Sequence, residues 1–302
     1  MNDDSTVQMP LVTSCGFVAL IGRPNVGKST LLNCLLDSKI SITSSKAQTT
    51  RQRVVGVLSE GLNQFVFVDT PGFQTRHRSA LNTKMNHAVR EALTDVDVVL
   101  ALFEGKTLDE ADETILRLLP QDKTVIGVVS KIDLLSDKAQ LLPFLDDLSK
   151  RFNFAALVPV SSSKGWQLDA LKQEIARHLP EGAWLYDEEA ITDRDERFLA
   201  AEFIREKIFR LTGDEIPYAT HVIVERFVQE GKLRKIDARV YVERDSQRAI
   251  LLGHQGQTLK RIATEARQDM ERLFGGQVFL TIHIQVKPGW MDDARILRQF
   301  DR

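Results

Sequence analysis

The feature that most constrains this 302-residue chain is the stretch Gly22-Arg23-Pro24-Asn25-Val26-Gly27-Lys28-Ser29. It has the form G-x-x-x-x-G-K-[ST], the motif of a phosphate-binding P-loop. An apolar, strand-like run, Phe17–Ile21, precedes it and a helix-like run follows, which is the context that the motif requires. The glycines let the backbone wrap closely around a phosphate, with consecutive N–H groups pointing inward. The sequence therefore predicts a nucleoside-phosphate site.

Each residue type in this motif has a chemical reason. Lys28 can reach the β- and γ-phosphates, and the Ser29 hydroxyl can ligate Mg²⁺. The helix that follows directs its positive end at the same anion. We assign the whole stretch to nucleotide binding, namely Gly22, Arg23, Pro24, Asn25, Val26, Gly27, Lys28, Ser29 and the first helical residue, Thr30.

The pattern along the first 180 residues predicts an α/β fold. Apolar runs typical of buried strands cover Phe17–Ile21, Arg53–Leu58, Gln64–Val68, Val96–Leu102, Val125–Val129 and Ala156–Val160. Amphipathic, helix-like segments cover Ser29–Leu36, Ala80–Leu93, Asp109–Leu119, Lys138–Arg151 and Gln167–His178. Apolar strands separated by helices indicate a mostly parallel sheet covered on both faces. Ligands of such sheets bind beyond the carboxyl ends of the strands.

A second polar segment, Asp69-Thr70-Pro71-Gly72, follows the strand Gln64–Val68. Asp69 can hold Mg²⁺ through water, and the Gly72 N–H can meet a γ-phosphate. The same four residues are also favourable for an ordinary turn. Between the P-loop helix and this segment, Thr49 and Thr50 are candidates to close over Mg²⁺.

A third segment, Ser130-Lys131-Ile132-Asp133, follows the strand Val125–Val129 and has the form x-K-x-D. A carboxylate at Asp133 can accept hydrogen bonds from guanine N1–H and the exocyclic amine, a pair that adenine lacks. The Lys131 stem can cover the base. Ser161 and Ser162 end the next strand, where a backbone N–H can meet guanine O6. These residues predict a preference for guanine.

The P-loop, D-T-P-G, x-K-I-D and V-S-S segments occur in the order and spacing of the translation-factor-like GTPases. The combination of G-R-P-N-V-G-K-S with K-A-Q-T-T-R resembles the bacterial Era family in particular. The resemblance implies a GTPase with slow intrinsic turnover, in which Lys28, Thr50, Asp69 and Gly72 act on the γ-phosphate. It also implies that Ser29, Thr50 and Asp69 hold Mg²⁺, with Thr49 as the alternative to Thr50, and that Asn25 binds an activating K⁺ in some relatives.

The family resemblance further implies the partners. They are 16S ribosomal RNA near its 3′ end and the small (30S) ribosomal subunit, whose assembly the family assists. No stable protein partner is expected. The expected location is the cytoplasm, with a peripheral contact on the cytoplasmic face of the inner membrane as a further implication.

Two departures from the family pattern bear on this interpretation. Ser130 replaces the usual Asn of N-K-x-D, which reaches guanine and ties its loop to the P-loop, and Ser162 stands where Ala is usual. Phe73 stands where Ras-like enzymes carry a water-orienting Gln. Arg76-His77-Arg78 is either a stabilising finger or a solvated segment. The rival interpretations are a KH RNA-binding protein with a degenerate nucleotide site and a P-loop ATPase.

We divide the chain into a tail (1–14), a GTPase domain (15–180), a linker (181–193), a type II KH domain (194–290) and a C-terminal tail (291–302). The expected order after the linker is helix–strand–strand–helix–helix–strand, with Thr192 or Asp193 as the cap of the first helix. The strands are His221–Val228, Lys235–Val242 and Val278–Val286, and the long helix is Thr258–Leu273.

A short loop in this part, Gly253-His254-Gln255-Gly256, has the G-x-x-G form of KH domains, which meets the backbone of single-stranded RNA. Lys260 and Arg261 at the start of the next helix are candidates for phosphate contacts. In the family the region after the last strand, with Lys287 and Trp290, helps bind RNA. Trp290 either stacks on a base or anchors the C-terminal tail by packing.

Composition adds only broad limits. The net charge of −2 gives no whole-molecule attraction to nucleic acid, although residues 221–302 hold fifteen Lys and Arg against eleven Asp and Glu. The two cysteines, Cys15 and Cys34, suggest core filling in a reducing compartment rather than a disulfide framework. The acidic start has no apolar signal region, and no stretch reaches the ~18 apolar residues of a membrane span.

Overall fold

The structure, a computed structural model, describes residues 12–44, 46, 50, 53–73, 80–105, 107–213 and 215–290. Thr49, Arg76-His77-Arg78 and most of both predicted tails lie outside the described residues. No helix within the described ranges is long and apolar enough to cross a membrane.

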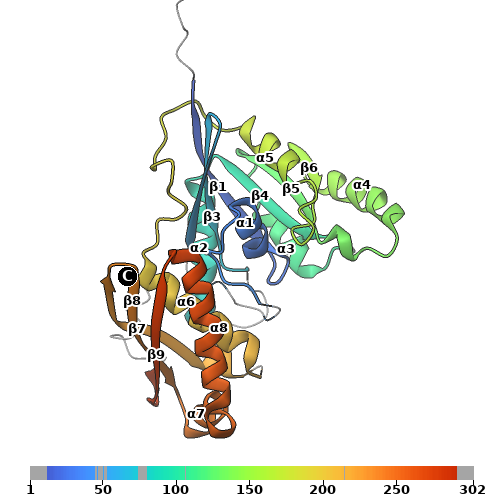
Figure 1. The fold of residues 1–302 in the computed structure, drawn as a ribbon. Helices are drawn as coiled ribbons and strands as arrows, with labels where there is room; N and C mark the ends of the chain where they lie inside the picture. The colour runs from blue at the N-terminus through green and yellow to red at the C-terminus, as the bar shows by residue number, and fades with distance from the viewer. Residues whose placement is uncertain are drawn as a thin grey trace, which may run out of the picture.

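The first part of the chain forms a six-stranded sheet in the order β2-β3-β1-β4-β5-β6. Its strands are β1 (Ser14–Gly22), β2 (Val54–Glu60), β3 (Asn63–Asp69), β4 (Val98–Glu104), β5 (Thr124–Ser130) and β6 (Ala156–Pro159). All neighbouring pairs are parallel except β2 with β3. The carboxyl ends of the five parallel strands therefore meet at one edge of the sheet (Figure 1).

Both faces of this sheet are covered because successive residues of its central strands are apolar. Val18 and Leu20 of β1 pack in one cluster with α1 and α5, whereas Ala19 and Ile21 pack in the other with α2, α3 and α4. These helices are α1 (Lys28–Leu35), α2 (Ala80–Thr94), α3 (Glu110–Leu118), α4 (Leu141–Arg151) and α5 (Leu168–Ala176). The predicted α/β class and mostly parallel sheet are confirmed.

The second part has the predicted order of elements. They are α6 (Glu196–Leu211), β7 (Thr220–Glu230), β8 (Leu233–Val242), α7 (Asp245–Leu252), α8 (Gln257–Phe274) and β9 (Gln277–Val286). The sheet order is β7-β8-β9, with β7 antiparallel and β9 parallel to β8. α6 and α8 contact each other and supply buried apolar residues to the core, including Ile204 and Ile262 (Figure 1).

The predicted cap of α6 is corrected by the structure. Neither Thr192 nor Asp193 caps the helix; the Asp195 carboxylate accepts a hydrogen bond from the Phe198 N–H at 2.7 Å. The Thr192 hydroxyl instead donates to the Val55 carbonyl of β2 at 2.7 Å. The chain before α6 is thus fastened to the edge strand of the first sheet, an interaction across 137 residues that local sequence does not reveal.

Candidate functional site

The P-loop joins the carboxyl end of β1 to the start of α1, and its backbone takes the unusual angles that wrapping a phosphate requires. Gly27, the N-cap of α1, has φ of 112°, and Asn25 has φ of 62°. The Lys28 ammonium lies inside the loop, donating to the carbonyls of Gly22 (3.0 Å) and Arg23 (3.1 Å). Burial lowers the pKa of Lys28 to about 8, and the Asp69 carboxylate opposes that change. The loop therefore holds a buried cation where an anion would bind.

The three predicted magnesium ligands are brought together at the ends of β3 and α1. The Asp69 Oδ2 atom accepts from the hydroxyls of Ser29 (2.7 Å) and Thr50 (3.2 Å), and these two hydroxyls lie 2.9 Å apart. The Ser41 hydroxyl, which the sequence did not single out, also donates to Oδ2 at 2.8 Å. Burial raises the pKa of Asp69, while Lys28 and these hydroxyls act to lower it.

This donor set fits Mg²⁺. Asp69 is fully buried, and within the described part of the chain its Oδ1 atom has no hydrogen-bond partner. A buried carboxylate oxygen without a partner is costly unless a cation or water satisfies it. Hard oxygen donors from a carboxylate and hydroxyls are those that Mg²⁺ prefers.

Gly72 lies directly against the P-loop. A Cβ atom built there would be 2.9 Å from the backbone of Pro24, so a side chain would push the two loops apart. The hydroxyl of neighbouring Thr70 donates to the Leu20 carbonyl at 2.7 Å, which ties the D-T-P-G segment to β1. Thr70 thus positions the segment rather than offering its hydroxyl to a ligand.

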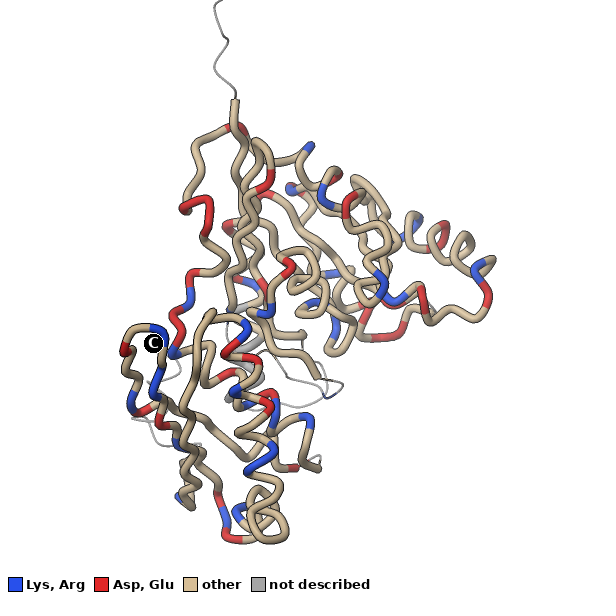
Figure 2. Tube along the Cα trace, in the orientation of Figure 1, with Lys and Arg blue, Asp and Glu red and all other residues tan. Residues whose placement is uncertain are grey.

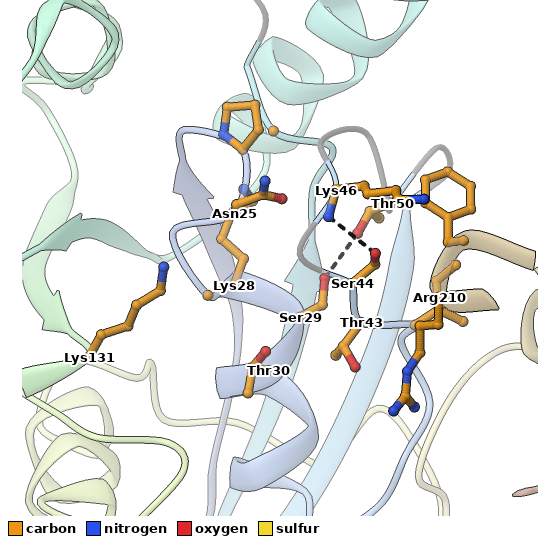
Figure 3. A pocket seen from close by; sticks show the side chains of 15 residues that line it. Asn25, Lys28, Ser29, Thr30, Thr43, Ser44, Lys46, Thr50, Lys131 and Arg210 are labelled. Atoms are coloured by element: carbon orange, nitrogen blue, oxygen red, sulfur yellow. Dashed lines mark hydrogen bonds between the residues drawn. The ribbon is translucent and has the colours of Figure 1, made fainter. Parts of the chain in front are cut away.

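These residues surround a cavity of about 680 Å³ (Figure 3). Residues predicted from the motifs that line it are Pro24, Asn25, Gly27, Lys28, Ser29, Thr30, Thr50, Gly72 and Lys131. Residues that the sequence did not indicate also line it: Ile42, Thr43, Ser44, Lys46, Phe209 and Arg210. Asp69 lies beneath the floor and acts through Ser29 and Thr50.

In the x-K-x-D segment, where the sequence predicts contacts with guanine, Ser130 retains the tie to the P-loop that its departure from Asn had put in question. Its buried hydroxyl lies 2.7 Å from the Val26 carbonyl and 3.1 Å from the Phe103 carbonyl. A hydroxyl has a single proton to donate, so it serves one carbonyl at a time. The link between the x-K-x-D loop and the P-loop therefore survives the substitution.

The Asp133 carboxylate is bonded by two neighbouring serines. Its two oxygens accept from the hydroxyls of Ser161 (2.6 Å) and Ser163 (2.9 Å), and these bonds lower the pKa of Asp133. A carboxylate that stays ionised is the acceptor that guanine N1–H and its amine require. The Ser161 N–H donates to the Trp166 carbonyl at 3.2 Å, so it is engaged, and Ser162 follows it in the same loop.

A link between the two loops runs through Glu104, at the end of β4, which the sequence analysis missed. Its carboxylate pairs with Lys131 (3.2 Å) and Arg23 (3.0 Å). Arg23 also lies 3.3 Å from the buried Asp112. The Arg23 side chain is therefore directed at carboxylates of β4 and α3, which leaves its backbone as the part of this residue that faces the P-loop's ligand in the prediction. The position of Glu104 at a parallel strand end was the available signal.

Phe73 is buried in the cluster of Ile21 and Val89. Its aromatic side chain has no group that could hold an attacking water. The position that supplies a water-orienting side chain in Ras-like enzymes is thus part of the core.

The G-x-x-G loop joins α7 to α8 and depends on its glycines. Gly253 ends α7 with φ of 67°, and a Cβ atom there would clash with Thr258. Gly256 caps α8 with φ of 78°, and Gln255 between them has φ of 51°. His254 and Gln255 are exposed, so the loop offers its backbone and two polar side chains to solvent.

The flanking basic residues are placed unequally. Lys260 and Arg261 are both exposed at the start of α8. Arg261 pairs with Glu265 at 2.8 Å, and other arginines of α8 pair with acidic residues in the same way. Figure 2 shows acidic as well as basic positions along this helix. The local positive charge therefore does not form a uniform basic face, and Lys260 is the stronger candidate for a phosphate contact.

Of the two alternatives for Trp290, stacking on a base or packing within the protein, the structure shows packing. It is 3% exposed, its ring stacks on His221 at 5.6 Å, and its Nε1–H donates to the Ala219 carbonyl at 3.2 Å. A ring buried between these groups cannot stack on a base, which corrects its assignment to RNA binding. The Lys287 N–H continues the sheet by donating to Val242 at 2.8 Å.

Known proteins resemble the chain along nearly its whole length. GTPase Era of Nitrosomonas eutropha is 53% identical over 94% of this chain and 96% of its own length. The chain belongs to the Era family of GTPases. GTPase Era of Chromobacterium violaceum is 51% identical over 95% of this chain and 97% of its own length. The predicted GTPase class is thereby confirmed.

Family models and solved structures agree with this assignment to the Era family. The model described as a 50S ribosome-binding GTPase matches residues 17–131, and the KH domain model matches residues 215–291. A variant of Aquifex aeolicus Era bound to GDP and AlF₄⁻ superposes with a TM-score of 0.90 at 37% identity, covering 95% of this chain and 99% of that one. A structure of Era with MgGDPNP and nucleotides 1506–1542 of 16S ribosomal RNA gives the same TM-score and identity, covering 95% of this chain and 98% of that one.

Proposed function

We propose that this GTPase binds 16S ribosomal RNA near its 3′ end and assists assembly of the small ribosomal subunit in the cytoplasm. The observation that carries the proposal is the exposed G-x-x-G loop next to Lys260, in a chain that matches an RNA-bound Era along 95% of its length. The name of the matched GTPase model mentions the 50S subunit, but that model covers only residues 17–131. The RNA complex, which matches both domains, is the more specific guide.

For the nucleotide site, we infer that Ser29, Thr50 and Asp69 hold Mg²⁺ and that Lys28 and the Gly72 N–H meet the γ-phosphate. Bound Mg²⁺ neutralises charge that develops on the phosphates. Lys28 exchanges its loop carbonyls for phosphate oxygens, and the buried surroundings strengthen that attraction. With Phe73 in the core, phosphate electrostatics replaces a conventional base, and slow intrinsic turnover follows. Asn25, which lines the cavity, is our candidate ligand for an activating K⁺.

We propose that residues 15–180 act as the switch and residues 194–290 as the RNA-binding module, joined by 181–193. GTP would hold Thr50 and Gly72 inward, and loss of the γ-phosphate would release them. The segment before Thr50 is bonded to α6 through Thr43 and Glu206, so its movement reaches the KH domain directly. The peripheral membrane contact that the resemblance implies remains a separate proposal, which liposome flotation of the purified protein tests.

The test is RNA binding in the two nucleotide states. A fluorescent RNA with the last ~40 nucleotides of 16S ribosomal RNA is titrated with the protein in MgGDPNP and in MgGDP. We expect tighter binding with MgGDPNP and about tenfold weaker binding of a shuffled RNA, because sequence-specific RNA recognition reads unpaired bases. Equal affinity for the native and the shuffled RNA in both states would contradict the proposal.

A further inference from the structure

One wall of the nucleotide cavity comes from the KH domain. Phe209 and Arg210, in the last turn of α6, line the cavity together with the P-loop. Phe209 is fully buried and packs edge to face on Tyr218, with ring centroids 5.8 Å apart, which fixes this end of the helix. In Figure 3 Arg210 lies on the side of the cavity opposite Lys131, with its guanidinium pointing away from Lys28 and Asn25. The cavity is therefore lined by residues of both parts of the chain.

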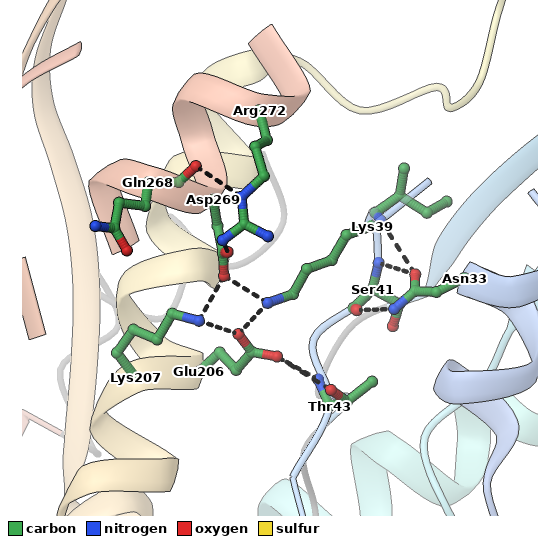
Figure 4. A network of polar contacts seen from close by, with 10 residues as sticks. Asn33, Lys39, Ser41, Thr43, Glu206, Lys207, Gln268, Asp269 and Arg272 are labelled. Atoms are coloured by element: carbon green, nitrogen blue, oxygen red, sulfur yellow. Dashed lines mark hydrogen bonds and ion pairs between the residues drawn. The ribbon is translucent and has the colours of Figure 1, made fainter. Parts of the chain in front are cut away.

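The position of α6 beside the cavity is set by a buried cluster of charges (Figure 4). Glu206, fully buried on α6, accepts from the Thr43 N–H at 2.9 Å and from Lys39 at 2.5 Å. Asp269 of α8 also pairs with Lys39 (2.6 Å) and with Lys207 of α6. Removing one member of such a buried cluster leaves an uncompensated charge. A shift of α6 that broke these pairs would have the same cost, so the cluster favours the observed position of the helix.

The end of α6 is held by a second lysine of the same segment. The Lys46 ammonium donates to the carbonyls of Thr212 (2.5 Å) and Gly213 (3.1 Å). A cation at this position satisfies terminal carbonyls of the helix. Arg210, two residues before Thr212, is not the residue that satisfies these carbonyls.

The basic side chains that line the cavity differ in what they already bind. Lys28 is bonded to P-loop carbonyls, Lys46 to the end of α6, and Lys131 to Glu104. Arg210 is exposed, and in the described part of the chain no hydrogen bond or ion pair engages its guanidinium. A guanidinium is always charged, and phosphate oxygens are among its strongest partners.

We propose that Arg210 is a nucleotide-binding residue supplied by the KH domain, contacting the phosphates of bound GDP or GTP. The inference rests on the assignment of this cavity to the nucleotide and adds a residue that no P-loop GTPase motif contains. It gives the KH domain a direct contact with the nucleotide, in addition to the contacts of α6 with Lys39, Thr43 and Lys46.

The test is titration of the full-length protein with MgGDP by calorimetry. Arg210→Ala is compared with Arg197→Ala, which removes the same charge from the first turn of α6, away from the cavity. We expect Arg210→Ala to raise the Kd for GDP about tenfold, the size of one charge-assisted hydrogen bond in a partly solvated site. Arg210→Lys should recover part of that loss, and Arg197→Ala should bind as the natural protein does.

Salt dependence separates a phosphate contact from a structural role. Loss of one charge contact should reduce the slope of log Kd against log salt concentration in Arg210→Ala, with the slope for Arg197→Ala unchanged. GDP binding by Arg210→Ala as tight as that of the natural protein would overturn the inference while leaving the nucleotide site in place. Failure of the natural protein to bind GDP would overturn both.

Discussion

The P-loop region and the G-x-x-G loop differ in burial: the side chains of the first are buried and hydrogen-bonded within the protein, whereas those of the second are exposed to solvent. Lys28, Thr50 and Asp69 are buried; the Lys28 ammonium donates to P-loop carbonyls, and the Thr50 hydroxyl donates to Asp69. His254 and Gln255 are exposed on a loop shaped by two glycines with positive φ. The first site is preorganised by its neighbours, whereas the second presents a backbone and relies on its partner for contacts.

This contrast predicts different sensitivity to substitution. A buried, hydrogen-bonded cation cannot be removed without leaving its partners unsatisfied. Substitutions among the buried P-loop residues should therefore cause a large loss of GTP turnover. An exposed loop side chain can be exchanged with little effect on folding, so changes there should act on RNA alone.

The largest effect should come from the buried end. Lys28→Ala should lower GTP turnover at least about a hundredfold, as expected when a buried electrostatic donor to the transferred phosphate is lost. RNA binding by the nucleotide-free protein should persist, because Lys28 is remote from the G-x-x-G loop in sequence and fold. Steady-state phosphate release measures the first and RNA titration the second. Normal hydrolysis by this variant would show that the site is misassigned.

A smaller effect is expected at the exposed loop. The double variant H254D and Q255D places two negative charges where RNA phosphates would lie, and we expect RNA affinity to fall at least about tenfold through like-charge repulsion. Basal GTP turnover should not change, since neither residue lines the nucleotide cavity. The matched control, H254N and Q255N, changes the same side chains without adding charge. An equal loss of RNA affinity in the control would contradict the charge explanation and show that the RNA contact depends on the shape of these side chains.

The smallest effect concerns a buried carboxylate below the P-loop. Burial raises the pKa of Asp112 to about 6, above its ordinary value of 3.8. As pH rises, the Asp112 carboxyl group therefore keeps its proton to a higher pH in the folded state than in the unfolded state. The stability that the protonated carboxyl group gives the folded state at low pH is lost as pH rises through 6. Asp112→Asn removes that titration, and its stability relative to the natural protein should increase by about 1 kcal/mol between pH 5 and pH 7. Urea unfolding at pH 5 and at pH 7 measures the free energy of unfolding of the variant relative to the natural protein. The same relative stability at both pH values would contradict the prediction. The exposed Asp146→Asn is the control and should show no such change with pH.

Much of this organisation was predictable because it is local in sequence. The P-loop, the D-T-P-G segment and the G-x-x-G loop depend on glycines and short polar runs at strand and helix ends, and their positions follow from the order of elements. The parallel pair β1 and β3 then brings Ser29 near Asp69, and the antiparallel pair β2 and β3, with Val54 opposite Asp69, brings Thr50 to the same place.

What the sequence did not reveal depends on contacts across long separations. Glu104 pairs with Arg23 and Lys131 only because β4 lies between β1 and β5. Arg210 reaches the cavity only because α6 is held by Glu206 and Lys46. The Trp290 alternatives could not be separated locally, because burial against His221 is a tertiary property.

The central claim, that this chain is a guanine-specific switch despite Ser130, is tested most directly by calorimetry with GDP and ADP in the presence of Mg²⁺, alongside a Ser130→Asn variant. The Ser130 hydroxyl already bonds the Val26 carbonyl, and the hydroxyls of two serines donate to the Asp133 carboxylate. We therefore expect micromolar GDP binding by the natural protein, about −8 kcal/mol, with ADP undetected. Absence of GDP binding that Asn at position 130 restores would contradict the claim and indicate an RNA-binding protein whose nucleotide site is degenerate.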